Sequence, residues 1–256
     1  MNRTVLITGS TSGIGLGIAR EFAKAGYRIA FNGLEKDGAE IAAAVAKEFG
    51  VNVFFSNANL LDAPAIEKFI SDAEKQLGPV DVLVNNAGMQ HVSAIEDFPV
   101  EKWNMIIGLN LSAAFHTTRL LIGGMKKRNR GRIINIASAH GLVASEFKSA
   151  YVAAKHGLLG LTKVAALEGA PFGITANAIC PGYVDTPLVR NQIASQAKTH
   201  QMSEEDVIAK VMLVKHAVKK FVTTESIGAL SVFLASDQAE LITGTAIPID
   251  GGWSAQ

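Results

Sequence analysis

Short apolar runs rich in β-branched residues alternate with longer segments of helical period along almost the whole chain. The runs predict seven strands, at residues 5–8, 27–32, 51–56, 80–85, 131–138, 174–180 and 245–250. The amphipathic segments predict six helices, at residues 14–25, 38–49, 64–77, 100–128, 150–168 and 223–236. Strands that are apolar throughout are typical of a parallel sheet covered on both faces. We therefore expect one doubly wound α/β domain over residues 1–256, with a seven-stranded parallel sheet and right-handed crossovers.

Residues 185–220 depart from this rhythm and form a helix-prone insertion after the sixth predicted strand. The second half of the insertion, EEDVIAKVMLVKHAVKK at 204–220, is amphipathic. In doubly wound folds, ligands bind beyond the carboxyl ends of the strands, which is where this insertion begins. We expect it to act as a substrate lid that closes over bound ligands and excludes water.

Composition restricts the partners and the compartment of the protein. A formal net charge of +1 gives no reason to expect a nucleic acid or an anionic membrane surface as a partner. The single cysteine, Cys180, excludes an internal disulfide framework and suits a reducing compartment. We find no run of the roughly 20 apolar residues that a membrane span needs, and no signal-peptide pattern. We expect a soluble cytoplasmic protein, and we assign no metal site.

A glycine-rich turn, TGSTSGIG at 8–15, follows the first predicted strand and opens the first predicted helix. Glycine lets the backbone turn sharply and approach a pyrophosphate, and the free N–H groups of a helix start attract anions. Such a turn can also be a plain strand-to-helix connection. Its place directly after the first strand favours a phosphate site and a Rossmann-type, dinucleotide-binding domain.

The end of the second predicted strand bears on the choice between NAD and NADP. Many NAD-binding domains place an acidic residue here for the adenosine ribose, whereas NADP-binding domains offer arginine. Asn32, Gly33 and Leu34 are neither, and Ser12 in the glycine turn is not basic. We therefore expect NAD as the cofactor, because no basic side chain awaits a 2′-phosphate.

Further motifs occur in a fixed order: NNAG at 85–88, Asn110, Ser138, and Tyr151 followed four residues later by Lys155. With the glycine turn, this set resembles the short-chain dehydrogenase/reductase family from Thr4 to Gly252. The resemblance implies that Asn110, Ser138, Tyr151 and Lys155 are catalytic. It also implies cofactor contacts from Gly9, Thr11, Ser12, Gly13, Ile14, Gly15, Asn32, Leu34, Asn59, Leu60, Asn86, Ala87, Gly88, Tyr151, Lys155, Pro181, Gly182, Val184 and Thr186. One departure is Asn59, since the family usually carries aspartate against the adenine; we expect adenine binding to survive.

The chemistry of alcohol oxidation gives these residues their roles. Hydride removal from an alcohol also requires loss of the hydroxyl proton, so a base is needed beside that oxygen. Tyrosine, with an ordinary pKa of about 10, needs help, which an ammonium four residues away and an oxidised nicotinamide would both supply. Ser138 can donate a hydrogen bond to the reacting oxygen. The resemblance implies that Asn110 bends its helix and helps to hold a water linking Lys155 to solvent.

Each of these residues also has an ordinary interpretation. A Tyr–Lys pair spaced by four residues is usually a surface contact, and a serine that ends a strand is usually a cap. We favour the catalytic interpretation because Ser138, Tyr151 and Lys155 occur together, in order, with the glycine turn.

A second group of polar residues indicates the substrate. The segments NNAGMQH, INIASAHGLVAS, KSAYVAAKHG and NAICPGYVDTPLVRNQI resemble the family members that oxidise (R)-3-hydroxybutyrate to acetoacetate with NAD. The resemblance implies a small hydroxy-acid substrate, whose carboxylate the donors Gln90, His140, Lys148 and Gln192 would hold. Trp253 would wall off a small pocket, and Tyr183 stands where these relatives carry tryptophan. The substrate site so predicted contains Gln90, Ser138, His140, Lys148, Tyr151, Tyr183, Gln192 and Trp253, although each of the four donors could instead be a solvated loop residue.

Two other functions remain to be weighed. An NADPH-dependent 3-oxoacyl thioester reductase would carry basic residues near Ser12 or Asn32 and would have little use for carboxylate-binding donors. A non-catalytic dinucleotide-sensing protein would have no need of the catalytic side chains, all of which are present. The resemblance also implies a homotetramer, in which the predicted helices 100–128 and 150–168 would be the packing faces.

Overall fold

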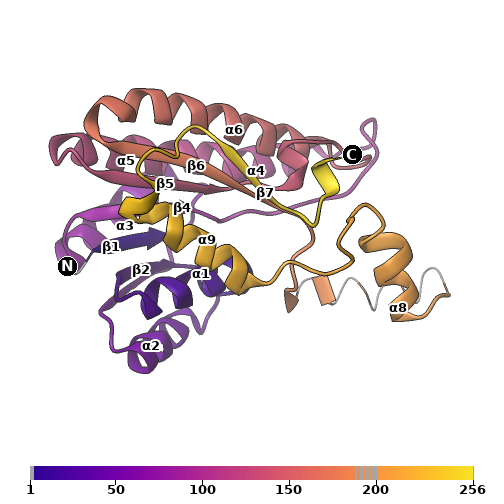
Figure 1. Cartoon of the computed structure of the whole chain (residues 1–256), viewed down its shortest axis with the longest axis horizontal. Helices are drawn as coiled ribbons and strands as arrows, with labels where there is room; N and C mark the ends of the chain where they lie inside the picture. Colours follow the sequence, from indigo (N-terminus) through magenta and orange to yellow (C-terminus); the bar gives the residue numbers. More distant parts are fainter. Residues whose placement is uncertain (1–2, 188, 191–192, 194–196, 198–200, 256) are drawn as a thin grey trace.

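The seven predicted strands form one parallel sheet. A computed structural model describes residues 3–187, 189–190, 193, 197 and 201–255, and it places the strands in the order β3-β2-β1-β4-β5-β6-β7 (Figure 1). The sheet order reverses direction between β1 and β4, which is the topology of a doubly wound, Rossmann-type fold. The strands are β1 (Thr4–Ile7), β2 (Arg28–Asn32), β3 (Val53–Ser56), β4 (Val80–Asn85), β5 (Gly131–Ile136), β6 (Ile174–Pro181) and β7 (Ala246–Ile249).

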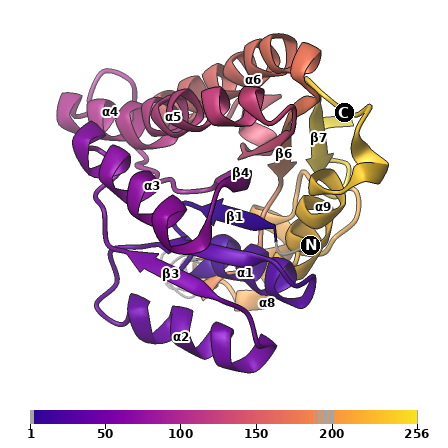
Figure 2. The same ribbon diagram turned by 90° about the vertical axis from the view of Figure 1, so that its left-hand side faces the viewer.

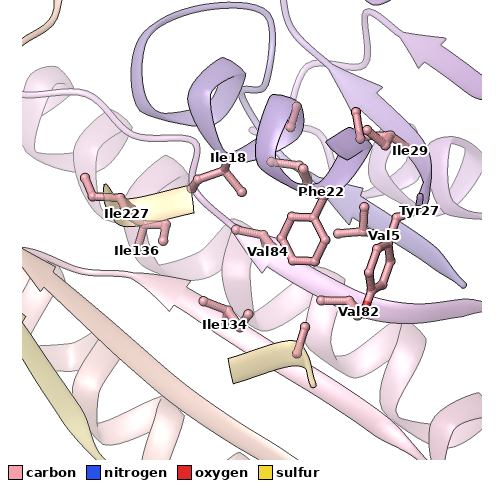
Figure 3. Close-up of a cluster of buried hydrophobic side chains, with 14 of the residues drawn as sticks. Val5, Ile18, Phe22, Tyr27, Ile29, Val82, Val84, Ile134, Ile136 and Ile227 are labelled. Atoms are coloured by element: carbon pink, nitrogen blue, oxygen red, sulfur yellow. The ribbon is translucent and has the colours of Figure 1, made fainter. Parts of the chain in front are cut away.

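Helices cover both faces of the sheet, as expected for parallel strands (Figures 1 and 2). Side chains alternate between the two layers: Val5 and Ile7 pack with α1 and α9, whereas Leu6 packs with α3 and α5. Figure 3 shows the first layer, in which Phe22 lies among strand residues. The helices are α1 (Gly13–Lys24), α2 (Gly38–Phe49), α3 (Ala63–Leu77), α4 (Val100–Ile107), α5 (Ala113–Lys127), α6 (Ser149–Gly169), α8 (Glu204–Val207) and α9 (Thr224–Ala235).

The predicted single helix at 100–128 is interrupted at its centre. Between α4 and α5 lies a five-residue π-helical turn, Gly108–Ser112, which carries Asn110. The Asn110 side chain turns away from the helix and bonds the backbone of Met89 at both its atoms, as donor to the carbonyl and acceptor from the N–H, each at 2.9 Å. A π turn adds one residue to a helical turn and is frequent at functional sites.

The helical run from Val100 to Lys127 is the one in the described part of the chain that is long and apolar enough to cross a bilayer by length and composition alone. This helical run was not predicted as a membrane span from the sequence, because polar side chains interrupt its apolar residues. In the structure it packs against α3 and α6, and 39% of its most apolar window is buried. Length and composition by themselves are weak support for a membrane span.

The amphipathic stretch 204–220 is helical over less of its length than its pattern suggested. Helix α8 continues into a second π turn, Ile208–Met212, and the chain then leaves the helix. Figure 1 shows α8 projecting away from the sheet. Beyond the π turn, the Nζ of Lys219 donates to the carbonyls of Leu213 and Val214, at 2.9 and 2.8 Å. The chain rejoins the body where the N–H of Val218 donates to the carbonyl of Gly251 at 2.8 Å.

A buried polar network joins the centre of the sheet to the helices beside it. Asn85 on β4 donates to Asn135 on β5 at 2.8 Å, and Asn135 donates to Thr162 on α6 at 2.8 Å. Thr117 on α5 donates to the Oδ1 of Asn85 at 2.6 Å. All four side chains are buried, so the removal of one leaves a buried polar atom of its partner without a hydrogen bond.

We predict that Thr117→Val lowers the free energy of unfolding by about 1–3 kcal/mol, because it removes the donor to buried Asn85. The adjacent Thr118 is a matched control, since its buried hydroxyl has no hydrogen-bond partner among the described residues. Thr118→Val should leave stability unchanged or raise it. Urea unfolding of both variants tests the prediction, and equal losses would contradict it.

Candidate active site

The glycine turn gives the amino end of α1 an open, anion-binding geometry. Gly9 and Gly13 have positive φ angles of 59° and 49°, which favour glycine. At Gly15, a Cβ atom would lie 2.0 Å from the carbonyl oxygen of Gly9, so any side chain is excluded there. The side chain of Ser12, at the N-cap, does not cap the helix. The turn therefore presents backbone N–H groups to an incoming phosphate, and a dinucleotide fits it.

A cleft of about 590 Å³ opens beside this turn. Of the predicted cofactor residues it is lined by Gly9, Ser12, Gly13, Ile14, Gly15, Asn32, Leu34, Asn59, Leu60, Asn86, Ala87, Gly88 and Thr186. The sequence analysis missed further lining residues, namely Gly33, Glu35, Ala58, Leu61, Met89, Met105, Leu109 and Pro187. The remaining predicted cofactor residues are not among its lining, namely Thr11, Pro181, Gly182, Val184, Tyr151 and Lys155.

Glu35 is the most informative of the missed residues. Its carboxylate accepts hydrogen bonds from the hydroxyls of Thr11 and Ser12, the latter at 2.9 Å. Burial tends to raise the pKa of Glu35, but the bond from Thr11 and further hydrogen bonds outweigh it, so the pKa lies below its usual value. Sequence analysis found no acidic residue at the end of the second strand because it stopped at Leu34. The spacing was informative: Glu35 lies 20 residues after Gly15, the usual interval to a ribose-binding acid.

Asn32 supports the cleft through bonds within the protein. Its Oδ1 accepts from the N–H of Gly9 at 3.2 Å, and its Nδ2 donates to the carbonyls of Ser56 and Ala58 at 3.2 and 3.0 Å. Asn32 is buried and ties the glycine turn to the end of β3. Asn59, by contrast, is exposed at the cleft, and its Oδ1 accepts from the N–H of Leu61 at 3.0 Å.

Ser138, Tyr151 and Lys155 lie together beyond β5 and on the first turns of α6. The Nζ of Lys155 donates to the carbonyl of Ile136 at 2.7 Å and lies 5.5 Å from the centre of the Tyr151 ring. Burial lowers the pKa of Lys155 to about 8. Burial raises the pKa of Tyr151, and the hydrogen bond with Ser138 opposes that rise. These side chains alone therefore do not give Tyr151 the lowered pKa that we expected from Lys155.

Asn110 and Lys155 share a small internal cavity of about 10 Å³, whose lining also includes Thr8, Asn85 and Ile136. Its volume suits a single water molecule, and its lining supplies several polar partners for one. The Asn110 side chain is occupied at Met89, so its contribution to this cavity is the bend of the π turn.

Three of the predicted substrate residues, Tyr183, Trp253 and His140, form an aromatic wall, and the ammonium of Lys148 lies against it. The rings of Tyr183 and Trp253 stack at 5.9 Å with an interplanar angle of 7°, and His140 meets Trp253 edge-on at 5.0 Å. The Nζ of Lys148 lies 5.9 Å from the Tyr183 ring centre. Gln90 is exposed on the loop after β4. Gln192 lies outside the described residues.

His140 links this wall to Ser138. Its Nδ1 is 3.4 Å from the Ser138 hydroxyl, and its Nε2 is 2.8 Å from the Ser145 hydroxyl. Burial, together with the charges of Lys148 and Lys215, lowers the pKa of His140 to about 4. The imidazole is therefore neutral near pH 7 and has one N–H to donate, with both ring nitrogens facing hydroxyls.

Comparison with known proteins shows the same family as the sequence motifs. The family profile described as short chain dehydrogenase matches residues 3–197. The chain belongs to the short-chain dehydrogenases. A D-beta-hydroxybutyrate dehydrogenase of Rhizobium meliloti is 53% identical over 100% of both chains. A protein of the same name from Cupriavidus necator is 51% identical over 99% of this chain and 98% of its own. A solved structure of a variant of actinorhodin polyketide ketoreductase with NADPH matches with a TM-score of 0.93 and 32% identity, covering 100% of this chain and 98% of its own.

Membership has two direct consequences. As a short-chain dehydrogenase, the protein is an oxidoreductase. The family and the Rossmann-type sheet also imply a nicotinamide dinucleotide cofactor, and the open glycine turn with its adjoining cleft fits such a group. Across the described residues, no cluster of three or more His, Cys, Asp or Glu side chains could hold a metal ion.

We predict that His140 makes stability depend on pH between about 4 and 6.5. A depressed pKa means that the unfolded chain binds a proton near pH 6.5 while the folded protein resists until about pH 4. Stability should thus fall as pH decreases through that window, by on the order of 3 kcal/mol from this group. Unfolding of wild-type protein and His140→Gln should show a difference in stability that shrinks toward pH 4. A difference independent of pH would contradict the prediction.

Proposed function

We propose that this short-chain dehydrogenase oxidises (R)-3-hydroxybutyrate to acetoacetate, reversibly, with NAD as hydride acceptor. The observation that carries the proposal is Lys148, a half-buried ammonium that forms no ion pair with any described residue. A buried cation without a carboxylate partner is costly unless it meets an anion. The charge of this cation acts on His140, whose Nδ1 lies 3.4 Å from the hydroxyl of Ser138. A short hydroxy acid, with its hydroxyl at Ser138 and its carboxylate at Lys148, satisfies both ends.

The catalytic side chains would then divide the work at the alcohol. The cofactor, when bound, accepts the hydride. Tyr151 takes the hydroxyl proton as general base, and Ser138 donates a hydrogen bond to the oxygen as it gains carbonyl character. Lys155, whose pKa burial lowers to about 8, remains largely an ammonium at pH 7 and can pass a proton through the water-sized cavity bounded by Asn110.

At the other end, Lys148 supplies the charge that binds the carboxylate, with Gln90 as a further donor. Gln192 keeps its proposed role in the lid, on the carboxylate side. We assign His140 to orienting the Ser138 hydroxyl, since its two ring nitrogens face Ser138 and Ser145. Trp253 and Tyr183 would enclose the short carbon chain, which limits substrate length.

The preference for NAD is supported by Glu35. Its lowered pKa keeps the carboxylate ionised at neutral pH, and Thr11 and Ser12 fix it beside the glycine turn. A negative charge at this place suits the hydroxyls of an adenosine ribose and repels a 2′-phosphate. The same charge counts against a 3-oxoacyl thioester reductase that uses NADPH.

We also propose a homotetramer assembled through the outer faces of α5 and α6. Exposed apolar side chains on these helices, such as Phe115, Val164 and Leu167, support that assignment.

For the cofactor, we predict that Glu35→Gln raises kcat/KM with NADP at least about tenfold, because it removes a charge close to the 2′ position while keeping one acceptor oxygen and the shape of the side chain. Glu40→Gln, the same change of charge on an exposed residue of α2, is the matched control and should alter neither cofactor. Initial rates with both cofactors test this. If wild-type protein already prefers NADP, the assignment of Glu35 fails.

For the substrate, we predict turnover of (R)-3-hydroxybutyrate with NAD and poor turnover of neutral alcohols of the same size. Lys148→Ala should raise KM for the acid about 10- to 100-fold with kcat little changed, because the lost interaction is present in both ground and transition states. Tyr151→Phe should lower kcat by about 10²–10⁴-fold, the usual contribution of a general base. The cofactor product is followed by absorbance. Good turnover of a neutral alcohol without turnover of the acid would refute the proposal.

A further inference from the structure

The end of the insertion brings a second ammonium to the aromatic wall. The Nζ of Lys215 lies 5.7 Å from the centre of the Trp253 ring, as the Nζ of Lys148 lies 5.9 Å from that of Tyr183. The two rings stack on each other, and His140 meets Trp253 edge-on. One cation from the head of α6 and one from the insertion therefore share a single aromatic pair.

The backbone on both sides of Lys215 is anchored. Before it, the N–H of Leu213 closes the π turn by donating to the carbonyl of Ile208 at 2.8 Å. After it, the fully buried His216 accepts at Nε2 from the N–H of Tyr183, at 3.3 Å. The ring of His216 also packs against Tyr183 and Trp253, at 6.1 and 5.8 Å. The position of Lys215 is thus set by the same rings that form the substrate wall.

The positive charge of Lys215 reaches the predicted carboxylate-binding residues. Burial lowers the pKa of Lys148, and the positive charge of Lys215 lowers it further. The pKa of His140 is lowered by burial, then by Lys148, then by Lys215. No carboxylate is among the groups that act on either pKa. An anion bound at Lys148 is therefore attracted by Lys215 as well, since the charge of Lys215 is felt at Lys148.

We propose that Lys215 is a specificity-determining residue that acts with Lys148 to select substrates with a carboxylate over neutral alcohols of the same shape. This inference rests on the proposed oxidation of a short hydroxy acid, and it adds a residue of the insertion to the carboxylate-binding end. The competing explanation is that Lys215 contacts Trp253 only to hold the insertion in place and has no role in substrate selection.

Two pairs of probes separate charge recognition from a structural role. The first pair is (R)-3-hydroxybutyrate and its methyl ester, compared as substrates by kcat and KM. The second pair is butyrate and butyramide, which have similar shapes and differ in charge; their binding to the protein–NADH complex is measured by calorimetry. Wild-type protein is compared with Lys215→Gln, Lys215→Arg and Lys220→Gln. The last removes an equal charge at an exposed lysine of the same segment.

We expect Lys215→Gln to raise KM for the acid, and the Kd for butyrate, about tenfold, which is the loss of one charge-assisted contact of ordinary strength. Values for the ester and butyramide should stay within about twofold, as should kcat, because the contact is made equally before and during reaction. Lys215→Arg should retain most of the wild-type affinity for the acid, and Lys220→Gln should match wild type. Equal melting temperatures would show that the variants are folded.

Three results would overturn the inference: equal losses for charged and neutral probes, no loss for either, or the same loss in Lys220→Gln. Failure of the proposed function has a different signature, which is no turnover of the acid by wild-type protein. In that event the calorimetric comparison of butyrate with butyramide decides the role of Lys215 without any need for oxidation.

Discussion

Parallel pairing of all seven strands is the constraint on which this molecule depends. Each strand then points its carboxyl end to the same edge of the sheet, so the segments after β1, β2, β3, β4, β5 and β6 gather there. Residues far apart in the chain, such as Gly9 and Asn86, become neighbours: the Nδ2 of Asn86 donates to the carbonyl of Gly9 at 2.8 Å. The cofactor cleft and the aromatic wall are two halves of that edge, on either side of the turn after β4.

The elements that were predictable from sequence are those whose signals are local. All seven strands and the six predicted helical segments lie close to the residue ranges predicted from the spacing of apolar residues and glycines. That spacing is a property of neighbouring residues, so it can be read from one sequence. A bend of the helix at Asn110 was expected from the resemblance, but the partner of its side chain was not, because Met89 lies 21 residues away in the sequence. Motifs identify a residue; they do not reveal which partner occupies its side chain.

The charged residues of the candidate site were also only partly predictable from the sequence. Glu35 lies one residue past the segment that was considered, and its importance depends on two hydroxyls from another turn. Lys215 belongs to a stretch that the sequence marks only as amphipathic, and the folded insertion places it on Trp253. His140 was predicted at the site, yet its neutral state follows from burial and from two lysines that converge on it in space. Electrostatic roles of this kind arise from the tertiary structure, so one sequence cannot supply them.

The π turn between α4 and α5 has a consequence for how this chain can change. It contains one residue more than α-helical geometry requires, and that residue sets the angular offset between the two helices. Each residue turns a helix by about 100°, so removing one from 108–112 would rotate the apolar stripe of α5 off the sheet. The length of the segment that carries Asn110 is therefore fixed by the core packing of the helix after it, in addition to the hydrogen bonds that Asn110 makes with Met89.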